Sequence, residues 1–412
     1  MLLLLPLLGA CSFDYRDSRL SDSLADEVPN SVLTGYVHTQ VERGTPSVRA
    51  SAERSSVFRS SHRAVMEDVR FREFDADGEA VTEGTADHAT VFTRNDNVEL
   101  SGSIRFTHIP DDFSVDATYL YWNDEERTLE GRPGETVQVR RGDGSVITGT
   151  GFSSSGIYRR VQFDGPVEGT YVAEEDSGED TEQHTARETP GENGTGENAG
   201  TNGERSEGPK RFSFSGDSTS IEMAEGRRRT ILSGSARISS EDTTITADRI
   251  ELYGDEFRFA RCSGDVKTEE SEKGIHLSSR NLFYDREEEL LRVEGYNEMV
   301  DMTNELVAKS GYLEHRGNED VTVFQIGVRI LKATEDTRMV CRSEFARYER
   351  ESDQLTLSGM PEVHWDDDEY RATRIIINLE SEEIRLEGDV EGTVTPEEEN
   401  QEEENREEGT DE

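Results

Sequence analysis

A short strand pattern recurs about every 31 residues along this chain, and this repetition restricts the possible folds more than any other feature. The pattern reads apolar, any, apolar, any, Gly, and its clearest copies are Leu355-Leu357-Gly359 and Ile384-Leu386-Gly388. Further copies are Leu291-Val293-Gly295, Leu232-Gly234-Ala236-Ile238, Leu100-Gly102-Ile104-Phe106, Val161-Phe163-Gly165-Val167, Leu129-Gly131, Cys262-Gly264-Val266 and Phe324-Ile326-Val328-Ile330, the last with Ile326 in place of glycine. Apolar residues two positions apart lie on one face of a strand, so each copy predicts a half-buried strand.

A second column of small residues precedes the glycine column at a nearly constant offset. Its members are Ala86, Ala117, Gly149, Ala247, Ser279, Ala308, Ser343 and Ala372. Two columns at a fixed offset and a fixed period indicate one supersecondary unit stacked on copies of itself. The sequence therefore predicts an all-β, stacked-repeat protein.

The composition agrees with stacked repeats and excludes some functions. Hydrophobic residues make up 32% of the chain, charged residues make up 33%, and the formal net charge is −45. Such a chain cannot build one large compact core, but each layer of a repeat protein needs only a thin apolar stripe. The strong acidity argues against nucleic acid as a partner, because like charges repel.

Two segments lack the strand pattern, and we expect both to be disordered. Residues 173–210 consist mostly of Glu, Gly, Asn, Thr and Pro, and residues 396–412 form an acidic tail. The first segment interrupts the repeats, so it predicts a linker between two β domains, 12–172 and 211–395. A flexible linker of this length is long enough to let the two domains meet end to end.

The N-terminus resembles the signal of a bacterial lipoprotein. Residues 2–10 are apolar and too few to span a bilayer, and Leu8-Gly9-Ala10 precedes Cys11. In such signals the cysteine becomes the lipidated first residue, which predicts cleavage after residue 10 and an anchor at Cys11. No Lys or Arg precedes the apolar run, so an ordinary signal peptide or a truncated membrane anchor remains as an alternative.

We find no pattern in the sequence that predicts catalysis, a metal site or a cofactor. There is no G-x-S-x-G elbow, phosphate-binding glycine loop or dinucleotide fingerprint, and the histidines are scattered. Cys262 occupies an apolar position of its repeat, so a buried thiol is the simplest interpretation. A disulfide with Cys341 would join non-adjacent repeats, which argues against it.

The two predicted domains resemble two families of lipopolysaccharide export proteins. The first, with Val69-Arg70-Phe71, Gly84-Thr85-Ala86-Asp87 and Leu100-Ser101-Gly102, resembles the periplasmic LptC component. The second, with Thr246-Ala247-Asp248-Arg249-Ile250, Val307-Ala308-Lys309 and Leu386-Glu387-Gly388-Asp389-Val390, resembles the LptA bridge protein and other OstA-like repeats. Members of the first family usually carry a membrane-spanning helix, and the two components are usually separate chains.

The resemblance implies a fold and a binding site. Both families form a twisted, slightly open β-jellyroll whose apolar interior receives lipid acyl chains. The repeat columns would then line this groove with Leu100, Ile104, Phe106, Leu129, Phe163, Val167, Leu232, Ile238, Val293, Met299, Leu357, Val363, Leu386 and Val390. Shielding about 12 methylenes would be worth on the order of 10 kcal/mol relative to water. The sequence alone does not distinguish an open groove from a closed core.

The resemblance also implies a function and partners. It suggests a non-enzymatic carrier or bridge for lipopolysaccharide or a related glycolipid in the periplasm. An inner-membrane ABC transporter would supply ATP energy, and an outer-membrane translocon would receive the lipid. An anchored structural or adhesive β-repeat lipoprotein and a β-helical carbohydrate-active enzyme are the alternatives. Because open jellyrolls have unpaired edge strands, we expect residues 161–172 to pair with residues 211–221, within one molecule or between copies.

Overall fold

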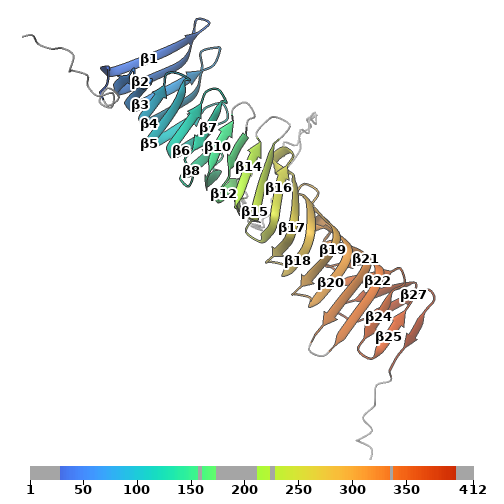
Figure 1. The fold of residues 1–412 in the computed structure, drawn as a ribbon. Helices are drawn as coiled ribbons and strands as arrows, with labels where there is room; N and C mark the ends of the chain where they lie inside the picture. Colours follow the sequence, from blue (N-terminus) through green and yellow to red (C-terminus); the bar gives the residue numbers. More distant parts are fainter. Residues whose placement is uncertain (1–27, 156–159, 173–210, 223–227, 335–336, 396–412) are drawn as a thin grey trace, which may run out of the picture. The chain divides into compact units, whose positions relative to one another are not determined.

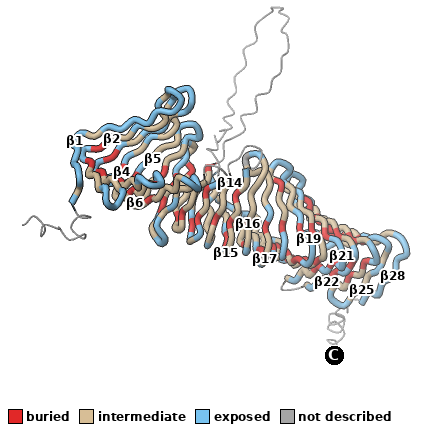
Figure 2. Tube along the Cα trace, turned by 45° about the horizontal axis from the view of Figure 1, so that its top comes forward, coloured by how far each residue is buried: buried red, intermediate tan, exposed pale blue. Residues whose placement is uncertain are grey.

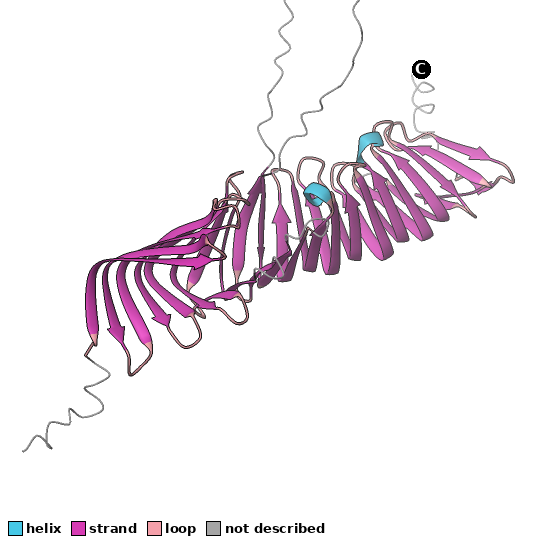
Figure 3. Ribbon diagram, turned by 90° about the horizontal axis from the view of Figure 1, so that it is seen from above, coloured by secondary structure: helices cyan, strands magenta, loops and turns pink. Residues whose placement is uncertain are grey.

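The computed structural model of the protein describes residues 28–155, 160–172, 211–222, 228–334 and 337–395, and these form an antiparallel all-β structure (Figures 1 and 3). Apart from strands, the described residues contain the short 3-10 helices η2 (Asp255–Phe257) and η3 (Gly317–Glu319). The all-β class is thus confirmed. No helix among the described residues is long and apolar enough to cross a membrane. The expected signal with Cys11, the linker 173–210 and the tail 396–412 lie outside the described residues.

Within the described residues the chain divides into two compact units, and the expected domain limits at 172 and 211 remain predictions. Unit 1 comprises Met1–Gly142 and Thr150–Ile157, and unit 2 comprises Asp143–Gly149 and Tyr158–Glu412. The strands of unit 1 are β1 (Ser31–Glu42), β2 (Thr45–Phe58), β3 (Arg63–Phe74), β4 (Ala80–Phe92), β5 (Asn97–His108), β6 (Phe113–Asn123), β7 (Thr128–Gly131), β8 (Thr136–Arg141) and β10 (Phe152–Ser155). Strands β1 to β6 pair in chain order, β6 continues to both β7 and β8, and β10 pairs with β7.

Unit 2 repeats the same meander with long strands. Its strands are β9 (Val146–Thr150, whose last residue belongs to unit 1), β11 (Arg160–Phe163), β12 (Val167–Val172), β13 (Arg211–Gly216), β14 (Ser218–Glu222), β15 (Arg229–Ser239), β16 (Thr243–Tyr253), β17 (Phe259–Glu270), β18 (Ile275–Asp285), β19 (Leu290–Asp301), β20 (Leu306–Arg316), β21 (Val321–Ala333), β22 (Arg338–Glu349), β23 (Gln354–Ser358), β24 (Glu362–Trp365), β25 (Asp368–Arg371), β26 (Arg374–Asn378), β27 (Ile384–Glu387) and β28 (Glu391–Thr393). Strands β15 to β22 pair in chain order, and β22 continues to both β23 and β24.

The glycine column marks a bulge in the middle of alternate long strands. In β17, Ser263 and Val266 pair with Asn281 and Ser279 of β18, so β17 holds one extra residue at Gly264. Gly264 has a φ of 74°, and Gly102, Gly234 and Gly295 also have positive φ. Glycine adopts this conformation without a steric penalty, and a bulge bends its strand. Each long strand is therefore divided into two arms by a bend, which we name the corner.

The small-residue column lies on the neighbouring strand, opposite the corner. Ala117 pairs with Ile104, Ala247 pairs with Ala236, and Ser279 pairs with Val266. A larger side chain on the inner side of this bend would compete for space with the residues of both arms. The two columns found in the sequence are thus the two sides of one repeated corner.

Ile326 is the exception in the glycine column. It has a φ of 69°, it is 64% exposed, and Gly327 follows it with a φ of 62°. A left-handed conformation is unfavourable for a β-branched side chain because Cβ crowds the backbone. The corner of β21 is therefore formed by a residue that is strained at this position.

We expect Ile326→Gly to stabilise the protein by about 1 kcal/mol. Relief of the left-handed strain should exceed the entropic cost of folding a more flexible unfolded chain. Thermal or urea unfolding would measure the change. Ile330→Gly, which removes a buried side chain of the same strand without relieving strain, should instead destabilise. A loss of stability in Ile326→Gly would show that the exposed side chain makes a favourable contact.

The strand pairing expected between residues 161–172 and 211–221 is present, and it lies inside unit 2. Strand β12 pairs with β13 from Val167 opposite Gly216 to Val172 opposite Arg211. Strand β11 pairs with β14, with Phe163 opposite Thr219. At Gly169 the Phe214 ring covers the backbone, and an added Cβ would lie 2.5 Å from the Val146 carbonyl oxygen. This close approach fixes the register of β9, β12 and β13.

The register of β12 and β13 predicts a selective cross-link. Glu168 and Ser215 are directly opposite, so Glu168→Cys combined with Ser215→Cys should form a disulfide under mild oxidation. Glu168→Cys combined with Phe214→Cys places the second thiol on the other face of β13 and serves as the control. Non-reducing electrophoresis after proteolysis between the strands would detect the bond, and equal yields from both pairs would contradict this register.

Candidate functional site: the apolar interior

Buried and exposed residues alternate along the strands, so one face of each arm points into an apolar interior (Figure 2). In unit 2, residues from both arms belong to one hydrophobic cluster: Cys262 and Val266 of β17 lie on either side of Gly264, and Val293 and Met299 of β19 lie on either side of Gly295. A single interior thus runs between the two arms of successive strands. This is the region that the sequence predicted as a lipid-binding groove.

In unit 1 the predicted lining residues become less buried toward the strand ends. Leu100 and Ile104 are 8% and 3% exposed, whereas Phe106 and Leu129 are half-buried. The first strand, β1, has almost no buried residue, and its Val32, Leu33, Val37 and Val41 are all exposed. Unit 1 therefore has a close-packed interior near its corner, and its first strand carries apolar side chains that are exposed to solvent.

In unit 2 most of the predicted lining residues are buried. The fully buried members are Phe163, Val167, Leu232, Val293, Met299, Leu357 and Val363, while Ile238 and Leu386 are half-buried and pack against the cluster. Val390 differs from the expectation: it is 54% exposed and lies between β27 and β28, outside the interior. Val390 lies just beyond Gly388, and no later strand among the described residues covers this end of unit 2.

The predicted lining omits many of the interior residues. They include Leu120, Leu282, Leu313, Phe324, Tyr348, Leu355, Ile375 and Ile377, all 2% exposed or less, of which Phe324 and Leu355 already stand in the repeat copies. Most of them lie on the strands between the glycine copies or just beside a copy. Their own alternation, as in Ile375 and Ile377, was the signal that could have identified them.

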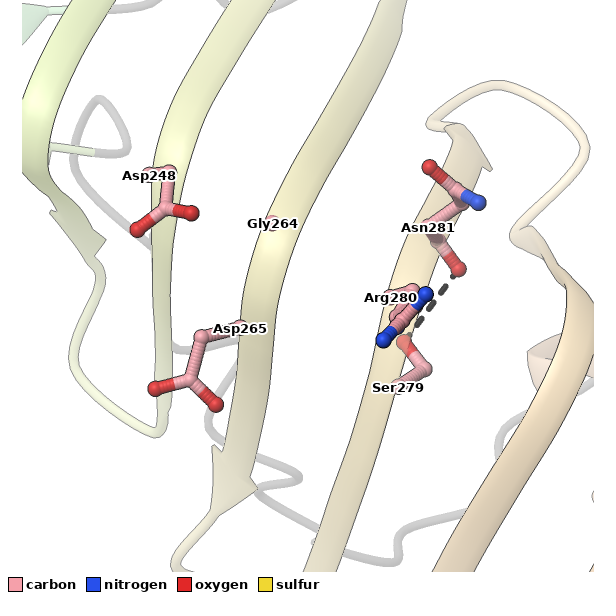
Figure 4. A pocket seen from close by; sticks show the side chains of 6 residues that line it. All are labelled: Asp248, Gly264, Asp265, Ser279, Arg280 and Asn281. Carbon is pink, nitrogen blue, oxygen red and sulfur yellow. Dashed lines mark hydrogen bonds between the residues drawn. The ribbon is translucent and has the colours of Figure 1, made fainter.

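A polar pocket lies outside this interior, at the corner of β16 to β18 (Figure 4). It is lined by Asp248, Gly264, Asp265, Ser279, Arg280 and Asn281, and the Ser279 hydroxyl donates a hydrogen bond to the Asn281 carbonyl oxygen at 3.2 Å. The absence of a side chain at Gly264 leaves room for the Asp248 carboxylate beside it. The same arrangement occurs at Gly102, where Asp87 accepts a hydrogen bond from the Ser103 backbone NH at 2.8 Å. The acidic residue after the small-residue column thus helps to hold the corner.

The ends of the two arms form two rims along unit 2. The first rim consists of the turns 254–258, 286–289, 317–320, 350–353 and 379–383, and the second rim includes the turns 240–242, 271–274, 302–305 and 366–367. We name them rim A and rim B. They are joined by polar contacts, because Arg350 of rim A lies 3.4 Å from the Asp301 carboxylate next to rim B.

Further contacts strengthen this junction. The Asn304 side-chain amide donates to the Tyr348 hydroxyl at 2.7 Å, and Arg350 donates to the Lys273 carbonyl oxygen at 2.8 Å. The Lys273 ammonium lies 3.7 Å from Asp320, and Lys332 donates to the Leu379 carbonyl oxygen. Burial and the nearby Asp301 raise the pKa of Tyr348 above its ordinary value, so its hydroxyl stays neutral at all physiological pH values. Rim A and rim B therefore meet over β17 to β26, and the interior there is enclosed.

Both described cysteines are buried free thiols. Cys262 and Cys341 are 0% and 1% exposed, and burial raises the pKa of each to about 12. A thiol with such a pKa is protonated at neutral pH and is a poor nucleophile. The expectation of a buried thiol at Cys262 is confirmed.

One group of side chains has the composition of a metal site. Glu362, His364 and Glu369 on β24 and β25 each bring a ligand atom within 4.8 Å of the others. However, the Arg371 guanidinium lies 2.6 Å from both carboxylates and already compensates part of their charge. Hydrogen bonds from Arg371 hold the pKa of Glu362 below its usual range. The arrangement is that of a satisfied ion cluster.

A corner-folded antiparallel meander with an apolar interior defines the class of this protein as an all-β, stacked-repeat protein. Residues 1–172 match the family model described as "Lipopolysaccharide-assembly, LptC-related", so the N-terminal part of the chain contains an LptC-related domain. The resemblance of this part, inferred from the sequence, is confirmed.

Among solved structures, the chain is similar to LptH, the LptA-homologous periplasmic component of the lipopolysaccharide transport device of Pseudomonas aeruginosa. The identity is 11%, the match covers 37% of this chain and 95% of that chain, and the TM-score of 0.21 is too low to support an argument. No curated protein matches the chain.

Proposed function

We propose that this protein is a non-enzymatic periplasmic carrier that shields the acyl chains of lipopolysaccharide or a related glycolipid on the way to the outer membrane. The observation that carries the proposal is the LptC-related domain in residues 1–172. The apolar interior of both units supports it, since an acyl chain needs a path that excludes water.

The energetics favour the interior as the lipid path. Moving about 12 methylenes out of water is worth on the order of 10 kcal/mol, and a lining of similar residues in every repeat keeps this gain nearly constant along the path. The proposed lining residues in unit 1 are Leu100, Ile104, Phe106 and Leu129. In unit 2 they are Phe163, Val167, Leu232, Ile238, Val293, Met299, Leu357, Val363 and Leu386. Enclosure of the interior over β17 to β26 requires side chains to move aside when lipid enters.

The proposal includes partners that supply energy and receive the lipid. An inner-membrane ABC transporter would provide the work of ATP hydrolysis, and an outer-membrane translocon would accept the cargo. Among the described residues β1 (Ser31–Glu42) pairs with β2 alone, and an edge of this kind can accept a strand from a partner or another copy.

Native mass spectrometry of the protein purified from membranes tests the proposal. We expect a co-purified glycolipid that is released by organic extraction, and a photoreactive residue at Leu232 should form an adduct with its acyl chain. A photoreactive residue at exposed Tyr296 is the matched control. A lipid-free protein that forms no adduct from Leu232 in cells would contradict the proposal.

We also propose that Cys11 is lipidated and anchors the chain in a membrane. Cys11→Ala should then move the protein from the membrane fraction to the soluble periplasmic fraction, because a diacylated cysteine supplies the main membrane affinity. Fractionation after washing with high salt would measure this change. Retention of the variant in membranes stripped of partner proteins would contradict lipidation as the anchor.

A further inference from the structure

The polar junction of rim A and rim B differs from an ordinary surface ion pair because its carboxylate at Asp301 is buried and because it joins both arms of the fold. The Asp301 residue is 1% exposed, and its carboxylate accepts hydrogen bonds from the backbone NH groups of Thr303 and Asn304 at 3.1 and 3.0 Å. The Asn304 side-chain amide donates to the same carboxylate at 3.0 Å and also to Tyr348 across the rims. Asp301 thus shapes the turn of rim B so that Asn304 reaches Tyr348, and it also receives Arg350 from rim A.

We propose that Asp301, Asn304, Tyr348, Arg350 and the pair Lys273–Asp320 form a latch that closes the side of unit 2 and opens to admit an acyl chain sideways. The inference rests on the proposed function, because it assigns the route by which lipid enters the interior. With the latch closed, an acyl chain can move only along the repeats. With the latch open, it can enter between rim A and rim B.

The position of the latch allows it to open without breaking the sheet. Asn304, Lys273 and Arg350 lie in turns, and the strand pairing of β19 with β20 and of β22 with β23 does not depend on them. When the rims separate, these polar groups become hydrated, and hydration replaces most of the energy of their hydrogen bonds. The net cost of opening is therefore small compared with the gain from burying an acyl chain.

The interior lies directly beneath the latch. Tyr348 is 2% exposed and belongs to the same hydrophobic cluster as Leu306 and Leu355, with its hydroxyl as the polar end that meets Asn304. Opening of the latch would uncover this part of the cluster. The Tyr348 ring thus lies between the polar groups of the latch and the apolar interior.

Lipid uptake by variants of the full chain tests the latch. The probe is a phospholipid with a pyrene-labelled 12-carbon acyl chain, transferred from neutral vesicles and followed by fluorescence. Arg350→Gln, Asn304→Ala and Tyr348→Phe should each accelerate uptake, up to about tenfold if the latch contributes one 1.4 kcal/mol step to the barrier. Tyr348→Phe removes only the hydroxyl, so it retains the core even if Arg350→Gln is poorly folded.

Arg316→Gln is the matched control for Arg350→Gln. Arg316 pairs with Glu314 and Glu319 on its own side of unit 2, so its loss does not affect contact between the rims. Uptake by this variant should equal that of the original protein. An equal acceleration in Arg316→Gln would overturn the latch, because it would show that loss of any positive charge near the rims accelerates lipid uptake.

A cross-link provides the opposite test. The chain contains five lysines, so a zero-length carbodiimide bond between Lys273 and Asp320 can be identified by mass spectrometry. This bond should slow sideways uptake, and Lys273→Gln should abolish the slowing. Unchanged uptake in the folded latch variants and in the cross-linked protein would overturn the latch alone. Failure of the original protein to take up any lipid would instead overturn the proposed function, and the latch as a lipid gate with it.

Discussion

Replacing Leu357 with aspartate is expected to unfold unit 2. Leu357 is 0% exposed, and it lies between Ala346 and Ile375, which are also 0% exposed. An unpaired carboxylate in this position costs several kcal/mol or must remain protonated, and the lost Leu side chain adds about 2–5 kcal/mol. The sum is comparable to the whole stability of a typical domain.

Circular dichroism and thermal unfolding of purified Leu357→Asp would measure this effect. Leu386→Asp provides the control, because Leu386 is half-buried near the last strands, where a carboxylate can reach water. We expect that variant to keep its strands and most of its stability. A Leu357→Asp protein with a normal melting transition would show that this part of the interior is an open, hydrated groove instead of an enclosed one.

The sequence predicted the repeat architecture because the cause of each corner is local. A strand that bends needs a residue that tolerates positive φ, and the opposite strand needs a small residue on the inner side. Residue pairs such as Gly264 and Ser279, or Gly102 and Ala117, meet these needs in most repeats, so the periodicity is visible without knowledge of the fold. The pairing of β12 with β13 was predicted from a different argument, that the end strand of an open jellyroll accepts another strand. In the structure β12 also pairs with β9, and β13 also pairs with β15.

Enclosure of the interior could not be predicted, because it depends on contacts between distant turns. Arg350 lies in a polar turn and Asp301 ends β19 just before another, and both turns look like ordinary solvent-exposed loops in the sequence. Only the folded arms bring these turns together. The same limit applies to Val390, whose repeat pattern is that of an interior residue although no later strand among the described residues covers it.

The enclosed interior changes how the proposed carrier must work. In a permanently open groove, lipid could bind with little movement of the protein. Around Phe324, Leu355 and Leu357, which are 0% exposed, an acyl chain can enter only if the interior side chains and the two arms separate. Lipid binding would then compete with packing of the protein. Variants that loosen the interior should therefore lose stability but bind lipid more readily than the original protein.

The corner itself gives the second prediction with a large effect. We expect Gly264→Ala to destabilise unit 2 by about 2–5 kcal/mol, because it combines left-handed strain with a steric clash. Gly264 has a φ of 74°, and an added Cβ would lie 2.8 Å from the Asp248 Cβ and even closer to its carboxylate. Urea unfolding monitored by circular dichroism would measure the loss.

Two further variants separate the strain from the clash. Gly295 has a φ of 93°, and a Cβ there would meet no described atom within 4 Å, so Gly295→Ala should cost only the strain of about 1–2 kcal/mol. Asp248→Ala removes the carboxylate, so adding Gly264→Ala to that background should cost less than Gly264→Ala alone. If the cost of Gly264→Ala is the same in both backgrounds and equals that of Gly295→Ala, then the Asp248 carboxylate does not constrain the corner, and the glycine column reflects backbone conformation alone.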